Sequence, residues 1–323
     1  MKKILLSGIK PTGRPHIGNY FGMMKQMVDT QDEYQSFPFI PDYHALTSVH
    51  SAEDMRRDTI NVVMDFLAIG LDPKKVNLFK QSDVPQVTEL NWIFNCITTM
   101  PYLMRAHAFK DAEAKNSEIN VGVFDYPILM AADILIQDTD VVPVGKDQIQ
   151  HVEMARDIAE KFNKIFGETF KLPESKLVSG VEVVPGTDGQ KMSKSHGNTI
   201  GLFAEDEEIH KAVMSIPTDS KGINESKDPE ECNVFALHKL FSTEDELGEL
   251  RKRYVEGGMG YKETKYILIK NIQKFIEPLK EKRKEIAQYP EIVDEILRKG
   301  GLVARERAEA KMMDVRKKVG LSS

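Results

Sequence analysis

The sequence predicts an α/β protein, in which a parallel sheet covered by helices is followed by a helical region. Short apolar runs alternate with longer amphipathic segments up to about residue 200. Strand signals then fade, and helical periodicity dominates the remaining residues. A chain of 323 residues with 41% hydrophobic side chains is long enough to bury a sizeable core. We therefore expect residues 1–200 to form one domain and residues 201–323 a second, α-helical one.

The expected elements alternate regularly along the first domain. Apolar runs of strand length begin at Ile4 and cover residues 36–40, 76–80 and 139–144. Strand–helix–strand alternation indicates right-handed crossovers and a parallel sheet, whose ligands bind at the carboxyl ends of the strands. His16, His44 and Gln81 all follow such ends. The expected helices cover residues 17–30, 52–70, 88–108 and 126–137, and another begins at residue 149.

Composition excludes several classes of protein. The net charge of −6 argues against a protein that coats nucleic acid non-specifically. No run of eighteen apolar residues indicates a membrane span, and no signal-peptide pattern follows Met1, so we expect a cytoplasmic protein without a membrane partner. Cys96 and Cys232 lie too far apart for a CxxC-type metal site, and we expect no bound structural metal.

The first strand leads through a Gly/Pro turn into the segment His16-Ile17-Gly18-Asn19, where a helix begins. A helix N-terminus offers unpaired backbone N–H groups and a favourable dipole to phosphate. Gly18 leaves room for a nucleotide, and His16 and Asn19 can donate hydrogen bonds to phosphate oxygens. The loop matches neither the P-loop pattern nor GxGxxG, so this loop alone is equally compatible with an ordinary turn.

A second loop carries the word Lys191-Met192-Ser193-Lys194-Ser195. The two lysines can each place an ammonium group on a polyphosphate. Asp147, which follows the fourth strand, is placed to accept a hydrogen bond from a ribose hydroxyl. We expect Mg²⁺ to arrive with ATP, because no carboxylate cluster resembles a dedicated cage.

A third candidate is Asp133, an acidic residue on an otherwise apolar segment. It can accept the polar hydrogen at the tip of an aromatic substrate, or it can serve a structural role, and the residues alone leave these readings about even. An indole N–H and a phenol O–H would satisfy it equally.

Taken together, HIGN near the N-terminus and KMSKS at residues 191–195 resemble the paired motifs of class I aminoacyl-tRNA synthetases. Residues 126–135, 145–148 and 156–159 resemble the bacterial tryptophanyl-tRNA synthetases in particular, and this likeness covers nearly the whole chain. It implies a Rossmann-like catalytic domain, a helical domain that reads the anticodon, and a homodimer. The implied reaction activates L-tryptophan with ATP and transfers it to tRNA(Trp).

The resemblance also assigns residues to sites. It implies that Asp133 binds the indole N–H and that Met130 packs on the ring. The expected catalytic residues are His16, Asn19, Lys191 and Lys194. The expected tryptophan site comprises Leu6, Gly8, His44, Tyr126, Met130, Asp133, Val142, Val144 and Gln148. The expected ATP site comprises Lys10, Pro11, Thr12, Gly18, Asn19, Lys110, Gly145, Lys146, Asp147, Val184, Lys191, Met192, Ser193, Lys194 and Ser195.

Two positions depart from the family pattern. Lys10 stands where glutamine is common, and Leu6 where a phenylalanine often lies under the indole. The four cysteines that hold an iron–sulfur cluster in some members are reduced here to two, so we expect no such cluster. A tyrosyl-tRNA synthetase, a small nucleotidyltransferase and a regulatory paralogue that binds tryptophan or RNA without charging tRNA remain alternatives.

Overall fold

The structure, a computed structural model, describes residues 2–106, 109, 110, 113, 119–145, 148–177 and 184–322. Two compact units account for the whole chain, and each combines segments that are distant in sequence. Unit 1 contains Met1–Gly13, Gln26–Ser179 and Tyr289–Ser323, and unit 2 contains Arg14–Lys25 and Gly180–Gln288. The boundary near residue 200, which rests on composition, stays a prediction.

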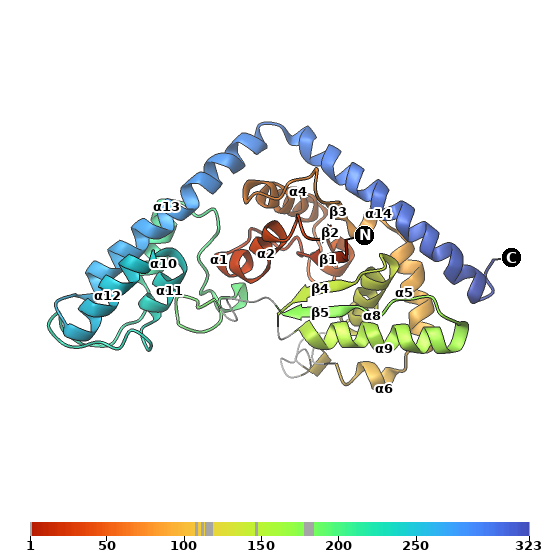
Figure 1. Ribbon diagram of the computed structural model, residues 1–323, viewed down its shortest axis with the longest axis horizontal. Helices are drawn as coiled ribbons and strands as arrows, with labels where there is room; N and C mark the ends of the chain where they lie inside the picture. The colour runs from red at the N-terminus through yellow and green to blue at the C-terminus, as the bar shows by residue number, and fades with distance from the viewer. Residues whose placement is uncertain are drawn as a thin grey trace. The chain divides into compact units, whose positions relative to one another are not determined.

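Unit 1 is built on a five-stranded parallel sheet with the order β3-β2-β1-β4-β5 (Figure 1). The parallel sheet is confirmed, and a strand overlaps each of the four predicted runs. The strands are β1 Ile4–Gly8, β2 Gln35–Ile40, β3 Phe79–Lys80, β4 Val141–Val144 and β5 Glu174–Leu177.

Two strands differ from the sequence prediction. The run at residues 76–80 is regular only at β3, and Val76 makes an isolated bridge to Ser36. The second difference is β5, which was not predicted. Its residues Glu-Ser-Lys-Leu are half-buried or exposed. An edge strand with one open side needs no continuous apolar run, so composition carries little signal for it.

The helices of unit 1 largely follow the predicted pattern. The Ser51 hydroxyl accepts a hydrogen bond from the Asp54 amide at 3.2 Å, and the helix that it caps ends before Gly70, which has a φ of +105°. The helices of this unit are α2 Lys25–Asp29 (which begins at the boundary with unit 2), α3 Asp42–Ala45, α4 Ala52–Ala68, α5 Gln86–Ile97, α6 Met100–Leu103, α8 Val121–Ile136, α9 Ile149–Phe166 and α14 Pro290–Lys318.

The predicted helix at residues 88–108 is wrong as one element, because it is divided into α5 and α6. A continuous helix would lose the backbone hydrogen bond at Pro101. Proline is tolerated in a first turn, where its missing N–H has no helical partner, and α6 begins in that way. Residues 107 and 108 lie outside the described part of the chain.

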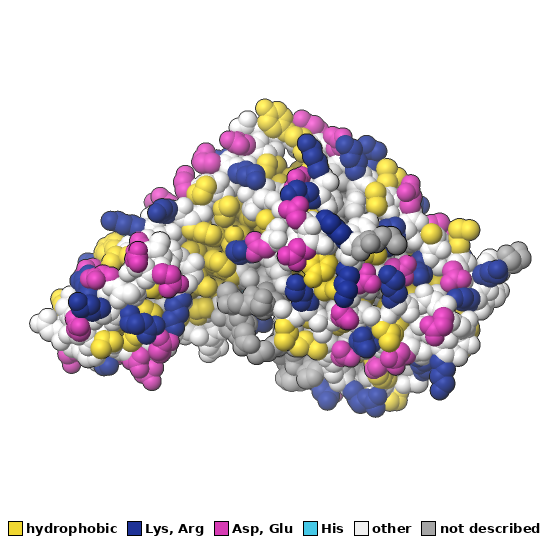
Figure 2. All heavy atoms as spheres, in the orientation of Figure 1, with side chains coloured by type: hydrophobic (Ala, Val, Ile, Leu, Met, Phe, Trp, Pro, Cys, Tyr) yellow, Lys and Arg dark blue, Asp and Glu magenta, His cyan; other side chains and the backbone are white. Residues whose placement is uncertain are grey.

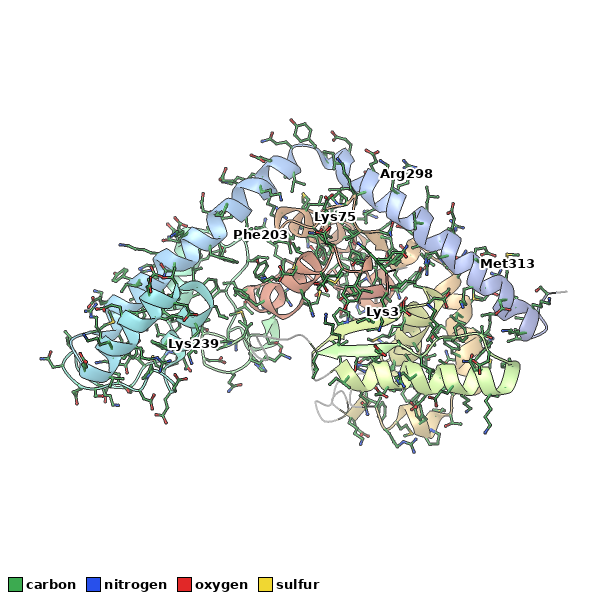
Figure 3. The ribbon with its side chains drawn as sticks, viewed as in Figure 1. Lys3, Lys75, Phe203, Lys239, Arg298 and Met313 are labelled. Atoms are coloured by element: carbon green, nitrogen blue, oxygen red, sulfur yellow. The ribbon has the colours of Figure 1, made fainter. Side chains whose placement is uncertain are left out.

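Helix α14 completes the core of unit 1. Figure 1 shows it lying across α4, β3 and α5, and its Ala304, Ala308 and Met312 are fully buried in the same cluster as Phe37 of β2. On its other side, Arg298 and Met313 point away from the unit (Figure 3).

The contact of α14 with β3 is unusually close. A Cβ atom added at Gly300 would lie 2.0 Å from the Leu78 carbonyl oxygen, so only glycine fits this crossing. Arg316 donates to both carboxylate oxygens of Glu89 in α5, at 2.8 and 2.6 Å. The last helix is therefore packed against the strand that precedes Gln81.

Helices dominate the chain after residue 200, as predicted; those up to residue 288 belong to unit 2, whereas α14 belongs to unit 1. The helix expected at residues 17–30 is confirmed, as α1 Ile17–Asn19, a π-helical stretch Tyr20–Met24 and then α2. In the core of unit 2, Ile17 packs with Ile200, Val234 and Leu268, and all four are at most 1% exposed. The longer helices of unit 2 are α10 Asp206–Met214, α11 Asn233–Phe241, α12 Glu244–Glu256 and α13 Tyr261–Ala287.

The described helices include none that is both long and apolar enough to cross a lipid bilayer. On the face drawn in Figure 2, Lys and Arg side chains are interspersed with Asp and Glu.

Candidate functional site

In unit 1, a group of buried polar side chains meets at the carboxyl edge of the sheet. β2 leads into α3, which carries His44, and β3 leads directly into Gln81. Because β2 and β3 are adjacent and parallel, these residues lie next to each other. Their common partner is Asp133 of α8, a residue only 4% exposed.

The Asp133 carboxylate is bonded from two sides. His44 Nε2 lies 2.9 Å from Oδ2, and Gln81 Nε2 donates to Oδ1 and Oδ2 at 2.8 and 2.9 Å. Burial raises the pKa of Asp133, whereas the hydrogen bonds of His44 and Gln81 oppose that rise. An ionised carboxylate has about four lone-pair sites, so it can accept one further donor from a ligand.

A second chain of polar groups runs from Tyr126 to Gln148. His151 Nδ1 lies 2.8 Å from Gln148 Oε1, and in this orientation of the amide Nδ1 carries the proton and donates. In the neutral ring Nε2 then accepts from the Tyr126 hydroxyl, at 3.0 Å. No site role was predicted for His151, although its position three residues after Gln148 at the start of α9 places both on one helix face.

Lys10 lies beside this chain. Its Nζ is 5.6 Å from the centroid of the Tyr126 ring, within the range of a cation–π interaction. The side chain reaches solvent, yet the protein atoms around it lower the pKa of Lys10 by desolvation. A cation held over an aromatic face beside His44 is placed to attract an anionic ligand.

The apolar residues predicted for the amino-acid site lie on β1, β4 and α8. Leu6, Val142 and Val144 are buried in the core cluster of unit 1, and Met130 is half-buried against it. Gly8 ends β1, and a Cβ atom there would lie 2.8 Å from the Phe39 ring. Contact of these residues with a substrate stays a prediction.

In unit 2, the HIGN segment is paired with the chain that follows KMSKS. The Ile17 amide donates to the Ile200 carbonyl at 2.9 Å, and the Leu202 amide donates to Pro15 at 3.0 Å. Asn19 Oδ1 accepts from the His16 amide at 3.0 Å, which caps the helix start. The two predicted motifs are therefore adjacent within one compact unit.

Gly18 and Met192 form the tightest contact between the motifs. The Gly18 amide lies 3.3 Å from Met192 Sδ, and a Cβ at position 18 would lie 2.8 Å from His16 Nδ1 and 3.2 Å from Met192 Cβ. Burial and then the charge of Lys194 lower the pKa of His16 to about 4. At neutral pH His16 is therefore an uncharged hydrogen-bonding group.

We expect Gly18→Ala to lower the free energy of unfolding by about 1–3 kcal/mol, because the added methyl group overpacks the His16 ring and Met192. Urea denaturation measures the change. Gly22→Ala is the matched control, since a Cβ there meets no atom within 4 Å. Equal stability of the two variants would contradict the close packing at Gly18.

The KMSKS loop is organised by Asn198, a residue only 2% exposed. Asn198 Oδ1 accepts from the Ser193 amide at 2.8 Å, and its Nδ2 donates to Asp188 Oδ1 at 2.7 Å and to the Lys191 carbonyl at 3.1 Å. The hydrogen bond from Asn198 is the main cause that lowers the pKa of Asp188. Sequence reasoning gave Asn198 no role, because asparagine after a glycine is an ordinary turn signal.

The remaining predicted ATP-site residues are placed as follows. The Thr12 amide donates to the Lys10 carbonyl next to Pro11, Gly145 directly follows β4, and the Val184 carbonyl accepts from the Met192 amide. Lys110, Lys191, Lys194 and Ser195 are exposed, while Ser193 is half-buried. Lys146 and Asp147 lie outside the described residues. Among the described residues, no group of three His, Cys, Asp or Glu side chains is arranged to hold a metal ion.

Comparisons with known proteins give a consistent picture. Residues 2–277 match the family described as tRNA synthetases class I (W and Y). The chain is 49% identical over 317 residues to the tryptophan–tRNA ligase of Fusobacterium nucleatum, covering 98% of this chain and 97% of the relative. It is 46% identical to that of Rhodopirellula baltica, covering 98% and 99%.

A solved structure is similar to this chain in both fold and sequence. A crystal structure of tryptophanyl-tRNA synthetase from Campylobacter jejuni, complexed with ADP and tryptophan, superposes with a TM-score of 0.91 at 46% identity. The match covers 98% of this chain and 99% of that one.

Proposed function

This chain belongs to the class I tRNA synthetases for tryptophan and tyrosine, and we propose from that membership that Asp133 recognises the indole N–H while the 191–195 loop acts on ATP. The reaction is that of a tryptophan–tRNA ligase, in which tryptophan and ATP form tryptophanyl-adenylate and pyrophosphate, and tryptophan then passes to tRNA. The observation that carries the proposal is the buried Asp133 carboxylate, which is bonded by His44 and Gln81 and retains capacity for one more donor.

Selection of the amino acid follows from this carboxylate. A buried acceptor is left unpaired by any analogue that lacks the matching hydrogen, and such sites reject these analogues by about 10⁴–10⁵-fold. Apolar side chains of β1 and β4 and the half-buried Met130 supply the surface for the ring. Tyr126, Gln148 and Lys10 supply polar contacts for the amino and carboxylate groups.

Adenylate formation is an in-line attack of the tryptophan carboxylate on the α-phosphate of ATP. The protein contributes positioning and charge stabilisation rather than covalent chemistry. Lys191 and Lys194 are exposed on a loop held by Asn198, where they can neutralise the departing pyrophosphate. His16 and Asn19 donate hydrogen bonds to phosphate oxygens, and Mg²⁺ enters with ATP.

The partners implied by this function are tRNA(Trp) and a second copy of the chain. Helix α8 contacts both α5 and α6, and the three helices expose Trp92 at 70%, Met100 at 65% and Val121 at 81%. We infer that a second subunit covers these apolar side chains. The cytoplasmic location and the anticodon-reading role of the helical region stay predictions.

Amino-acid-dependent exchange of labelled pyrophosphate into ATP tests the proposed function. Exchange with tryptophan and not with tyrosine supports the assignment of the pocket. Exchange with tyrosine would overturn the role of Asp133 in selection. Silence with every amino acid in folded protein would favour a regulatory paralogue.

We expect Lys10→Gln to remain active with a KM for tryptophan or ATP raised several-fold, because the cation over Tyr126 adds attraction for an anionic substrate without being needed for bond formation. Steady-state kinetics measure the change. Lys3→Gln, at an exposed ion pair with Glu174, is the control. Complete loss of activity in Lys10→Gln would show that the cation takes part in the chemical step.

A further inference from the structure

Gln81 is completely buried at the start of a short turn, Gln81–Asp83, that follows β3. Its side-chain oxygen accepts hydrogen bonds from the backbone amides of Tyr43 at 3.0 Å and His44 at 3.3 Å. These N–H groups open α3, and the first amides of a helix have no partner within the helix. Gln81 supplies an acceptor for both amides from the turn after the neighbouring strand, and the Tyr43 amide also donates to Asp42 Oδ1 at 3.1 Å.

The two amides also determine which way the Gln81 side chain points. A backbone N–H can only donate, so the atom facing Tyr43 and His44 must be the oxygen. The NH₂ group is thereby directed at Asp133, where it donates to both carboxylate oxygens at 2.8 and 2.9 Å. A reversed amide would place two donors against each other and two acceptors against each other.

Gln81 and His44 both form hydrogen bonds with the Asp133 carboxylate, but they differ in which oxygens they contact. The His44 ring contacts only Oδ2, whereas the Gln81 NH₂ group bridges both oxygens. A bridge to both oxygens limits rotation of the carboxylate plane. It also stabilises the ionised form, which accepts hydrogen bonds and donates none.

We propose that Gln81 is a positioning residue that keeps the Asp133 carboxylate oriented to accept the indole N–H, and so determines how strongly tryptophan is preferred over an isostere without that hydrogen. This inference rests on the proposed role of Asp133. Gln81 acts through Asp133 and needs no contact with the substrate itself.

The experiment compares tryptophan with β-(1-benzothiophen-3-yl)-L-alanine, in which sulfur replaces the indole N–H. The ratio of kcat/KM for the two in pyrophosphate exchange measures the contribution of the N–H. For Gln81→Met we expect this ratio to fall by about tenfold or more, because tryptophan loses an oriented acceptor and the analogue loses nothing. Gln86→Met is the matched control, since Gln86 is also buried in unit 1 but donates to Glu309.

The readout separates positioning from general damage. If Gln81 only supports the fold, kcat/KM falls equally for both substrates and the ratio stays at the wild-type value, which would overturn the proposal. A wild-type ratio near one would instead refute the role of Asp133 itself. The two failures are therefore distinguishable.

A second variant guards against misfolding of Gln81→Met. Gln81→Glu keeps an oxygen for the amides of Tyr43 and His44, but it brings a second carboxyl group against Asp133. Two carboxyl groups in contact share one proton, which weakens Asp133 as an acceptor. We expect the ratio to fall in this variant too, and a wild-type ratio would contradict the proposal.

Discussion

Asp133→Asn is expected to lower kcat/KM for tryptophan by about a thousandfold, which is the largest effect that we predict for the amino-acid site. The asparagine amide has one acceptor and one donor end. The Gln81 NH₂ group lies 2.8 and 2.9 Å from the two carboxylate oxygens, so the asparagine NH₂ group meets that donor whichever way the amide turns. Pyrophosphate exchange with tryptophan measures the loss.

The benzothiophene analogue, which lacks the N–H, tests whether this loss comes from the N–H contact. Its kcat/KM should change little in Asp133→Asn, so the preference for tryptophan should nearly vanish. Asp125→Asn is the control on the same helix, because Asp125 accepts from Asn91 and Asn95 instead. Equal losses for both substrates would show that Asp133 serves the fold and not selection.

Lys194→Met is expected to lower kcat for pyrophosphate exchange by about 10²–10³-fold with little change in the KM for tryptophan. In the proposed mechanism, the charge of Lys194 is needed when negative charge develops on the departing pyrophosphate, and not when tryptophan binds. Lys211→Met, at an exposed lysine of α10, is the control. A kcat within about threefold of wild type would contradict this role.

The same variant has a second, independent readout. The positive charge of Lys194 contributes to the lowered pKa of His16, after burial. Removing that charge favours the protonated imidazole, so the pKa of His16 should rise above about 4. An NMR titration of the imidazole measures the change, and a further fall would refute the proximity of the two side chains.

The parts that sequence predicted correctly share a physical reason. Strands buried on both faces must be continuously apolar, as Ile4-Leu5-Leu6 and the run before Gly145 are, so composition reports them. Asp133 attracted attention because an acidic residue among apolar neighbours needs a reason. The exposed edge strand β5 carries no such constraint and was missed.

The sequence did not reveal the contacts of three polar residues at the site, Gln81, His151 and Asn198. Gln81 was placed at a strand end, but its partner Asp133 is 52 residues away on another element. Asn198 looks like a turn residue until its buried amide is seen between Ser193 and Asp188. Periodicity reports which face is buried, and it does not report which polar groups meet there.

The discontinuity of unit 1 has a consequence for synthesis on the ribosome. Residues 1–179 include every described strand of the sheet, and α14 packs against β3 and the Leu78 carbonyl that precedes it. Chains emerge from the N-terminus at about 5–20 residues per second, and domains generally fold as units. The surface of the sheet that α14 covers therefore stays exposed while residues 180–288 of unit 2 are synthesised. This surface is accessible to chaperones until Gly300 and the rest of α14 have been synthesised.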